Sequence, residues 1–196
     1  PADGATDLIS AAEKAFGKVD ILVTNTGGPP AGMFEDHSAE VWDEAIAQNF
    51  SSVVNLVRAA LPGMKERRWG RIVNVTSISV KQPVKGLILS NAIRAGVTGF
   101  AKTISNEVGE FNVTVNNVLP GYTRTERLIH LAEAIAERDD TTVDSAYAGW
   151  AEEIPMSRLG EPHELGAMAT FLCSEQASYV TGQSIAVDGG WTKGLI

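Results

Sequence analysis

The chain has 196 residues, which suits one compact domain and leaves little room for two. Hydrophobic residues make up 44% and charged residues 20%, a balance typical of globular proteins and not of disordered ones. The formal net charge of −8 argues against nucleic acid and against an anionic membrane as the main partner.

The sequence also bounds the compartment and the metal content. Cys173 is the only cysteine, so no intrachain disulfide can form and a cytoplasmic location is expected. No apolar run approaches the roughly 18 residues that span a membrane, and the N-terminus lacks the basic and apolar regions of a signal peptide. The three histidines are scattered and no metal-binding motif occurs, so no metal site is predicted.

The spacing of apolar residues predicts alternating helices and strands. The expected elements, in chain order, are a helix over 5–16 that ends at Gly17, a strand over 19–24, a helix over 38–68 with Pro62 breaking or bending its end, a strand over 71–76, a helix over 87–111, a strand over 113–119, helix-prone residues 125–153 with a break at 139–140, a helix over 164–174 and a strand over 184–187.

This alternation predicts an α/β fold: a Rossmann-like, doubly wound parallel sheet with helices on both faces, in a single domain over 1–196. Ligands of such sheets bind beyond the carboxyl ends of the strands. The loops after Thr24, Thr76 and Leu119 open at that edge, so the functional site is expected there.

The first part of a dinucleotide-binding sheet has no counterpart in the sequence. Such a sheet carries a glycine-rich turn after its first strand, and no G-x-G-x-x-G pattern occurs in the N-terminal region. The sequence starts at Pro1, without a methionine, and enters a helix directly. It reads as if a β-α-β-α-β segment of roughly 60 residues were absent.

Six stretches carry a family resemblance through their order and spacing. They are 21–27 (ILVTNTG), 48–50 (QNF), 70–77 (GRIVNVTS), 120–125 (PGYTRT), 158–164 (RLGEPHE) and 179–190. Together they resemble the short-chain dehydrogenase/reductase family, closest to its β-ketoacyl-reductase-like branch, in which the first stretch reads I-L-V-N-N-A-G.

The resemblance implies an NAD(P)-dependent oxidoreductase that acts on a carbonyl or alcohol of a small-molecule substrate, with NAD and NADP not distinguished. It places Asn49 and Ser77 at the catalytic centre. The residues that it implies for cofactor contact are Asn25, Thr26, Gly27, Ser77, Arg94, Pro120, Gly121, Thr123 and Thr125.

The sequence departs from the family at the proton-transfer step. The family places a tyrosine 13 residues after its serine and a lysine four residues later, and these positions here hold Ser90 and Arg94. Because a serine hydroxyl is a much poorer acid than a phenol, the proton relay is expected to be weak. Two functions stay open: an oxidoreductase with an atypical relay, or a catalytically silent relative that binds a nucleotide or small ligand or serves in an assembly.

Alternatives also stay open for single residues and segments. Arg94 can bind ribose or an anion, or form a salt bridge on the helix surface. Thr125 can contact the carboxamide or cap the following helix. Residues 125–153 can form a hydrophobic substrate lid or ordinary amphipathic packing. Helices 38–68 and 87–111 correspond to the family's dimer-forming helices, so a homodimer or homotetramer is expected.

Overall fold

The structure, a computed structural model, describes residues 2–195 apart from the side chains of residues 2, 127, 134 and 138. The helices are α1 (Ala2–Phe16), α2 (Ala39–Ile46), α3 (Ser52–Arg67), α4 (Ile88–Val108), α5 (Glu126–Arg138), α6 (Val143–Glu153) and α7 (Pro162–Cys173). The strands are β1 (Ile21–Thr24), β2 (Gly70–Val75), β3 (Val113–Pro120) and β4 (Ser184–Val187).

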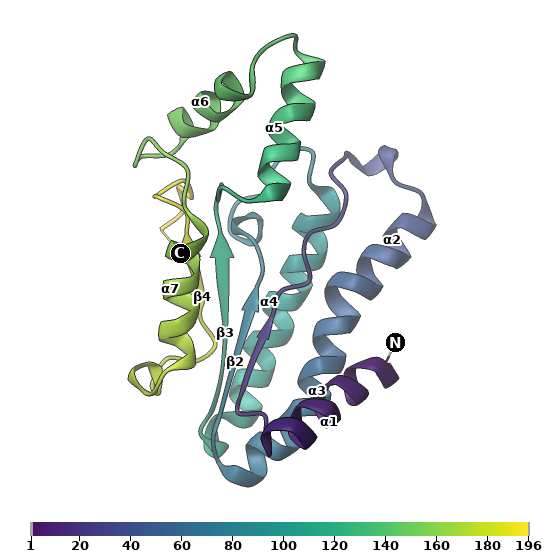
Figure 1. Cartoon of the computed structure of the whole chain (residues 1–196), viewed down its shortest axis with the longest axis vertical. Helices are drawn as coiled ribbons and strands as arrows, with labels where there is room; N and C mark the ends of the chain where they lie inside the picture. Colours follow the sequence, from purple (N-terminus) through teal and green to yellow (C-terminus); the bar gives the residue numbers. More distant parts are fainter. Residues whose placement is uncertain (1, 196) are drawn as a thin grey trace.

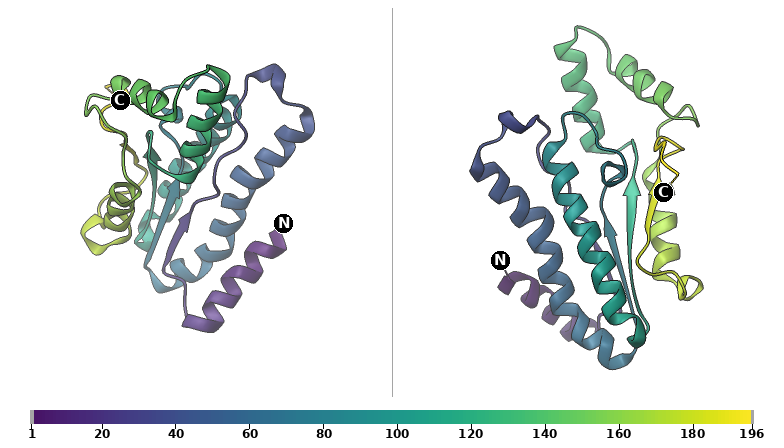
Figure 2. Two further views of the ribbon diagram at one scale, coloured as in Figure 1. Left: turned by 45° about the horizontal axis from the view of Figure 1, so that its top comes forward. Right: turned by 180° about the vertical axis from the view of Figure 1, so that it is seen from behind.

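The four strands form one parallel sheet in the order β1-β2-β3-β4. Helices α3 and α4 cover one face and α7 covers the other, as Figure 1 and the reverse view in Figure 2 show. Helix α1 packs against α3. This arrangement confirms the predicted α/β, doubly wound architecture.

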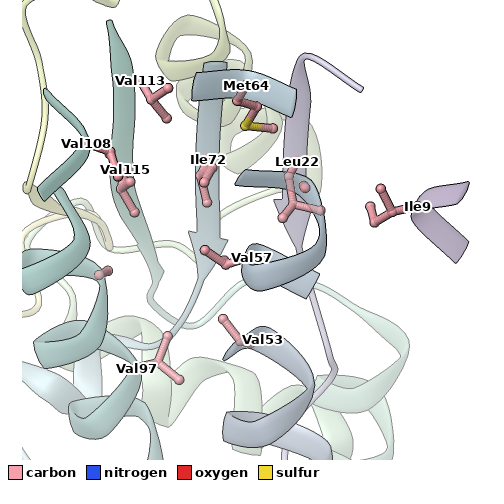
Figure 3. Close-up of a cluster of buried hydrophobic side chains, with 12 residues drawn as sticks. Ile9, Leu22, Val53, Val57, Met64, Ile72, Val97, Val108, Val113 and Val115 are labelled. Carbon is pink, nitrogen blue, oxygen red and sulfur yellow. The ribbon is translucent and has the colours of Figure 1, made fainter. Parts of the chain in front are cut away.

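The largest apolar core lies between the sheet and the helices of one face (Figure 3). Val53 and Val57 of α3 and Val97 of α4 are buried against Ile72 and Val115 of the sheet. Close packing of this kind fixes both helices relative to the strands. It therefore fixes the position of α4, which carries Ser90 and Arg94.

Strand β1 is one of the two edge strands of the sheet. Its side chains alternate, so that Leu22 and Thr24 are buried whereas Ile21 and Val23 are each 47% exposed. Helix α7 packs on β2, β3 and β4 and leaves these two side chains of β1 half-exposed.

The predicted single helix over 38–68 is interrupted. Helix α2 runs into a π-helical turn at Ala47–Ser51, and α3 follows that turn. Pro62 lies inside α3 and does not end it. The helix continues through Pro62 because Val57 and Met64, on either side of it, are held in the core.

No helix in the range 2–195 is both long and apolar enough to cross a membrane. Within the same range, no cluster of three or more His, Cys, Asp and Glu side chains is placed to hold a metal ion.

A buried ladder of hydrogen bonds crosses the sheet at the level where β1 and β2 end and β4 begins. All of its groups are side-chain groups. Thr24 Oγ1 donates to Asn74 Oδ1 at 2.8 Å, and Asn74 Nδ2 donates to Asn117 Oδ1 at 3.1 Å. Asn117 Nδ2 in turn donates to Ser184 Oγ at 3.0 Å. Each pair is in direct register on neighbouring strands. Because each interior member both donates and accepts, the ladder stabilises the register of the four strands.

We predict that Asn74→Ala lowers the free energy of unfolding by about 2–4 kcal/mol, because Thr24 and Asn117 would both lose a buried partner. Urea denaturation measures the change. Asn106→Ala, at an exposed position on α4, is the matched control and should cause no loss. Equal stability of the two variants would contradict the role given to the ladder.

Candidate functional site

The predicted site residues gather at the carboxyl edge of the sheet, in three groups. The turn after β1 carries Asn25 and Gly27, both exposed, and Thr26, which is half-buried. Ser77 follows β2, and residues 120–125 end β3 and enter α5. The buried side of α4 and the π-helical turn supply the remaining predicted residues from the face covered by α3 and α4.

Arg94 joins the first of these groups to the neighbouring segments. Its side chain is 4% exposed, so it does not lie on the helix surface. Nη1 donates to Thr26 Oγ1 at 3.2 Å and to the Val75 carbonyl at 3.3 Å. Nη2 donates to Asn49 Oδ1 at 3.1 Å and to the Gly27 carbonyl. All four acceptors are uncharged oxygens.

Asn49 is the second buried member of this network, with 1% exposure. Its Oδ1 accepts from Arg94 and from the Thr26 hydroxyl at 3.2 Å, and its Nδ2 donates to the Ala45 carbonyl at 3.1 Å. The π-helical turn widens the helix at this point, a local distortion often found at functional sites. The amide is thus held with its oxygen toward Arg94.

Ser90 lies one turn before Arg94 on the same buried side of α4 and is 8% exposed. Its hydroxyl makes no hydrogen bond with any part of the chain that the structure describes. Ser77 caps the short turn Ile78–Val80, and its Oγ accepts from the Ser79 backbone amide at 3.1 Å. The Ser77 hydroxyl hydrogen is therefore left to donate to another group.

None of the four hydrogen bonds described above for Arg94 involves a tyrosine. Tyr122 stacks on Trp150 with centroids 5.4 Å apart and meets Trp191 edge-on, and Tyr147 also packs on Trp150. Tyr179 is fully exposed. Burial, with the nearby Glu153 carboxylate, raises the pKa of Tyr122, which makes that phenol a poorer acid than usual.

The loop after β3 forms a separate wall of the site. Gly160 donates to the Tyr122 carbonyl at 2.9 Å, and the Arg124 amide donates to the Gly160 carbonyl at 2.8 Å. Thr123 donates to the Gly121 carbonyl at 3.2 Å. Thr125 stands at the N-cap position of α5 but makes no capping hydrogen bond, so capping is not what occupies its hydroxyl.

The segment between α6 and α7, which contains Gly160, is held by an ion pair. Arg158 donates to both carboxylate oxygens of Glu164, at 2.6 and 2.8 Å, and the Glu161 amide donates to the same carboxylate at 2.8 Å. These bonds hold the pKa of the Glu164 carboxyl at about 2, below its ordinary value of 4.5.

Asn91 braces the loop between Ser77 and Ser90, which the sequence did not indicate. Its amide donates to the Val84 carbonyl at 3.0 Å and its oxygen accepts from the Val84 amide at 3.3 Å. This two-way pairing mimics a strand ladder and closes the loop onto α4. The only sequence signal is an asparagine directly after Ser90, which does not by itself predict this contact.

Comparison with known proteins identifies the family. A family model described as Enoyl-(Acyl carrier protein) reductase matches residues 2–192. D-beta-hydroxybutyrate dehydrogenase of Cupriavidus necator is 38% identical over 192 residues, which cover 94% of this chain and 72% of that protein. Nodulation protein G of Azospirillum brasilense is 36% identical over 183 residues, covering 93% and 70%. The chain belongs to the short-chain dehydrogenase/reductase family, as its motifs suggested.

Solved structures agree with this assignment. L-sorbose reductase from Gluconobacter frateurii, determined with NADPH and L-sorbose, matches with a TM-score of 0.93 and 31% identity. The match covers 100% of this chain and 74% of that one.

We predict that Glu164→Gln destabilises the protein at neutral pH and flattens its acid denaturation. Because the folded-state pKa is depressed, the carboxylate's contribution is complete above about pH 4.5 and is lost as the pH falls toward 2. Urea denaturation between pH 2 and 7 measures the difference between variant and wild type. The exposed Glu107→Gln serves as control, and parallel pH dependences for wild type and Glu164→Gln would refute the prediction.

Proposed function

We propose that the protein is an NAD(P)-dependent oxidoreductase that interconverts a carbonyl and an alcohol with a weak proton relay. The observation that carries the proposal is the geometry of the carboxyl edge. The turn after β1, Ser77 after β2 and the loop 120–125 after β3 surround one edge of the sheet, in a chain whose fold matches an NADPH-bound reductase. Open parallel sheets bind their ligands at this edge.

The residues of this chain fit one end of a nicotinamide cofactor. Gly27 is exposed with a φ of +68°, and an added Cβ there would meet no atom within 4 Å, so a ligand can approach its backbone. The exposed Thr125 hydroxyl is not used in capping and suits the carboxamide. The sequence contains no glycine-rich turn for the pyrophosphate. The residues that select NAD or NADP follow that turn, so the proposal does not distinguish the two cofactors.

When bound, the nicotinamide gives or takes the hydride. The chain's own contribution is then to bind and polarise the substrate oxygen. Ser77 suits this task because its Oγ accepts from Ser79 and keeps a hydrogen to donate. Arg94 and Asn49 hold the neighbouring turn and do not supply a proton, since a guanidinium stays charged and a carboxamide does not ionise.

The weak step is protonation of the substrate oxygen. Ser90 stands where the family has its tyrosine, and its hydroxyl is shorter by a ring and far less acidic. A water that bridges Ser90 to the substrate would be a poor acid as well. Loss of a general acid typically costs about 10² to 10⁴ in rate, so slow turnover is expected.

A catalytically silent relative is the second candidate, and the same position favours it. Ser90 offers no proton, and the tyrosines nearest the site, Tyr122 and Tyr147, are held in the aromatic cluster. Such a protein would bind a nucleotide or small ligand, or act within an assembly, and would show binding without turnover.

The proposal includes a substrate lid at 125–153 and a cytoplasmic setting. Tyr147 and Trp150 of α6 pack on the loop after β3. The half-buried Leu128, Leu131 and Ile135 of α5 are then the apolar residues that could cover a substrate. A single cysteine, which leaves no partner for an intrachain disulfide, is typical of the cytoplasm.

We predict that the double variant Ser90→Tyr with Arg94→Lys raises carbonyl reduction at saturating nucleotide by up to about 10², because it restores an acid and the cation that lowers its pKa. Nucleotide binding should weaken, since lysine cannot replace all the hydrogen bonds of Arg94 to the turn after β1. Ser90→Tyr alone should gain less. NADPH and NADH oxidation with a broad carbonyl panel measures the rates, after nucleotide affinity has been determined.

The matched control replaces exposed residues of the same types, Thr103→Tyr with Arg58→Lys, and should leave the rate unchanged. If the double variant is saturated with nucleotide and still reduces no carbonyl in the panel, the proposal of an oxidoreductase with a weak proton relay is wrong. The silent-relative candidate then takes its place.

We also predict self-association through α3 and α4. Phe50 and Phe100 meet edge-on at 6.4 Å and, like Val54 and Ile104, are only half-buried beside the core. A helix with apolar residues on two sides needs a second partner. Light scattering should give the mass of a dimer or tetramer at micromolar concentration, and the mass of a monomer would contradict this prediction.

A further inference from the structure

The Arg94 guanidinium has no terminal hydrogen left for a ligand. Its two terminal nitrogens carry four hydrogens, and the structure supplies four acceptors: Thr26 Oγ1 and the Val75 carbonyl for Nη1, and the Gly27 carbonyl and Asn49 Oδ1 for Nη2. With the side chain 96% buried, these groups belong to the protein's own framework. Direct recognition of a ribose or a carboxylate by this fork is therefore not what the geometry favours.

The acceptors come from segments that are far apart in the sequence. Thr26 and Gly27 form the turn after β1, Asn49 lies in the π-helical turn, and Val75 ends β2. None of these segments is covalently close to Arg94 on α4. One side chain thus joins three segments that meet near the carboxyl ends of β1 and β2.

The Thr26 hydroxyl completes the arrangement. It accepts from Arg94 Nη1 at 3.2 Å and donates to Asn49 Oδ1 at 3.2 Å, so that the three side chains form a closed ring of hydrogen bonds. The related motif I-L-V-N-N-A-G has alanine at this position. An alanine here would leave one guanidinium hydrogen and one amide lone pair unsatisfied in a buried setting, which is costly.

We propose that Arg94 is a positioning residue that holds the Thr26–Gly27 turn in its ligand-ready place, and that Thr26 is the partner that makes an arginine workable there. A lysine ammonium has three hydrogens on one point and cannot span four acceptors in a plane. Because the turn is ordered before a ligand arrives, binding does not have to supply the free energy of ordering it. The effect on nucleotide binding rests on the proposed function, whereas the four hydrogen bonds of Arg94 do not.

The four hydrogen bonds of Arg94 to Thr26, Gly27, Asn49 and Val75, called the tie below, have a spectroscopic signature that does not depend on activity. Rotation of a guanidinium held at all four terminal hydrogens is slow, so separate Nη signals should appear in the nitrogen NMR spectrum of the labelled full chain. Arg58, which is exposed, should give averaged signals. The spectrum of Arg94→Lys assigns the signals by their disappearance.

Two substitutions at one position separate the hydroxyl from the shape of the side chain. Thr26→Ser keeps the hydroxyl and should keep the resolved Arg94 signals. Thr26→Val keeps the shape, loses the hydroxyl and should collapse those signals to an average. Thr103→Val, at an exposed position on α4, controls for the loss of a threonine hydroxyl elsewhere.

Nucleotide titration of the same variants tests the functional half. With NADPH and NADH as probes, Thr26→Val should bind about 3- to 10-fold more weakly than wild type, the worth of one net hydrogen bond, and Thr26→Ser should recover most of the loss. Thr103→Val should match the wild type.

The outcomes separate the inference from the proposed function. Averaged Arg94 signals in the wild type overturn the tie, even if Thr26→Val fails to fold. Resolved wild-type signals that collapse only in Thr26→Val support it. If neither nucleotide binds the wild type but the signals are resolved, the cofactor assignment fails and the tie stands. If nucleotide binds and Thr26→Val binds equally well, the claim of a ligand-ready turn is wrong.

Discussion

The buried guanidinium of Arg94 sets the shape of the site. It lies at the meeting point of α4, the turn after β1, the π-helical turn and the end of β2, and it satisfies polar groups that would otherwise be stranded. Removing a charged donor from such a network leaves several acceptors unpaired at once. The chemistry open to Ser90 follows from this, because the arginine one turn further along α4 is already engaged by the protein's own oxygens.

The rest of the fold keeps those segments in reach of Arg94. Packing of α3 and α4 on the sheet sets the distance between helices and strands, and the ladder from Thr24 through Asn74 and Asn117 to Ser184 holds the strands in register. The apolar packing fixes the spacing between the helix layer and the sheet, and the polar ladder fixes the register of the strands. Together they bring loops from four strands to one edge of the sheet.

Sequence reasoning was able to give the architecture because periodicity and strand alternation are local signals. Helix and strand order, the parallel sheet and the family were all predicted, and Gly17 with φ of +85° ends α1 as expected. The interruption at Ala47–Ser51 was not foreseen, since a π-helical turn leaves the apolar spacing nearly intact. The contact between Thr26 and Arg94 joins residues 68 apart, and no single-sequence pattern encodes it. The clue was a pair of departures from one family's motifs, and only the structure shows that the two side chains touch.

The central claim is that the site keeps Ser77, which can bind and polarise a carbonyl oxygen, but has no side chain at the Ser90 position that can donate the proton. The most direct measurement is the pH dependence of NADPH- or NADH-driven carbonyl reduction by the unaltered full chain, between pH 5.5 and 9.5. If water near Ser90 supplies the proton, the rate should be low and should show no titration step across this range, because water does not ionise there. A plateau that ends in a titration step within this range would reveal an ionising donor in the protein, and would contradict the account.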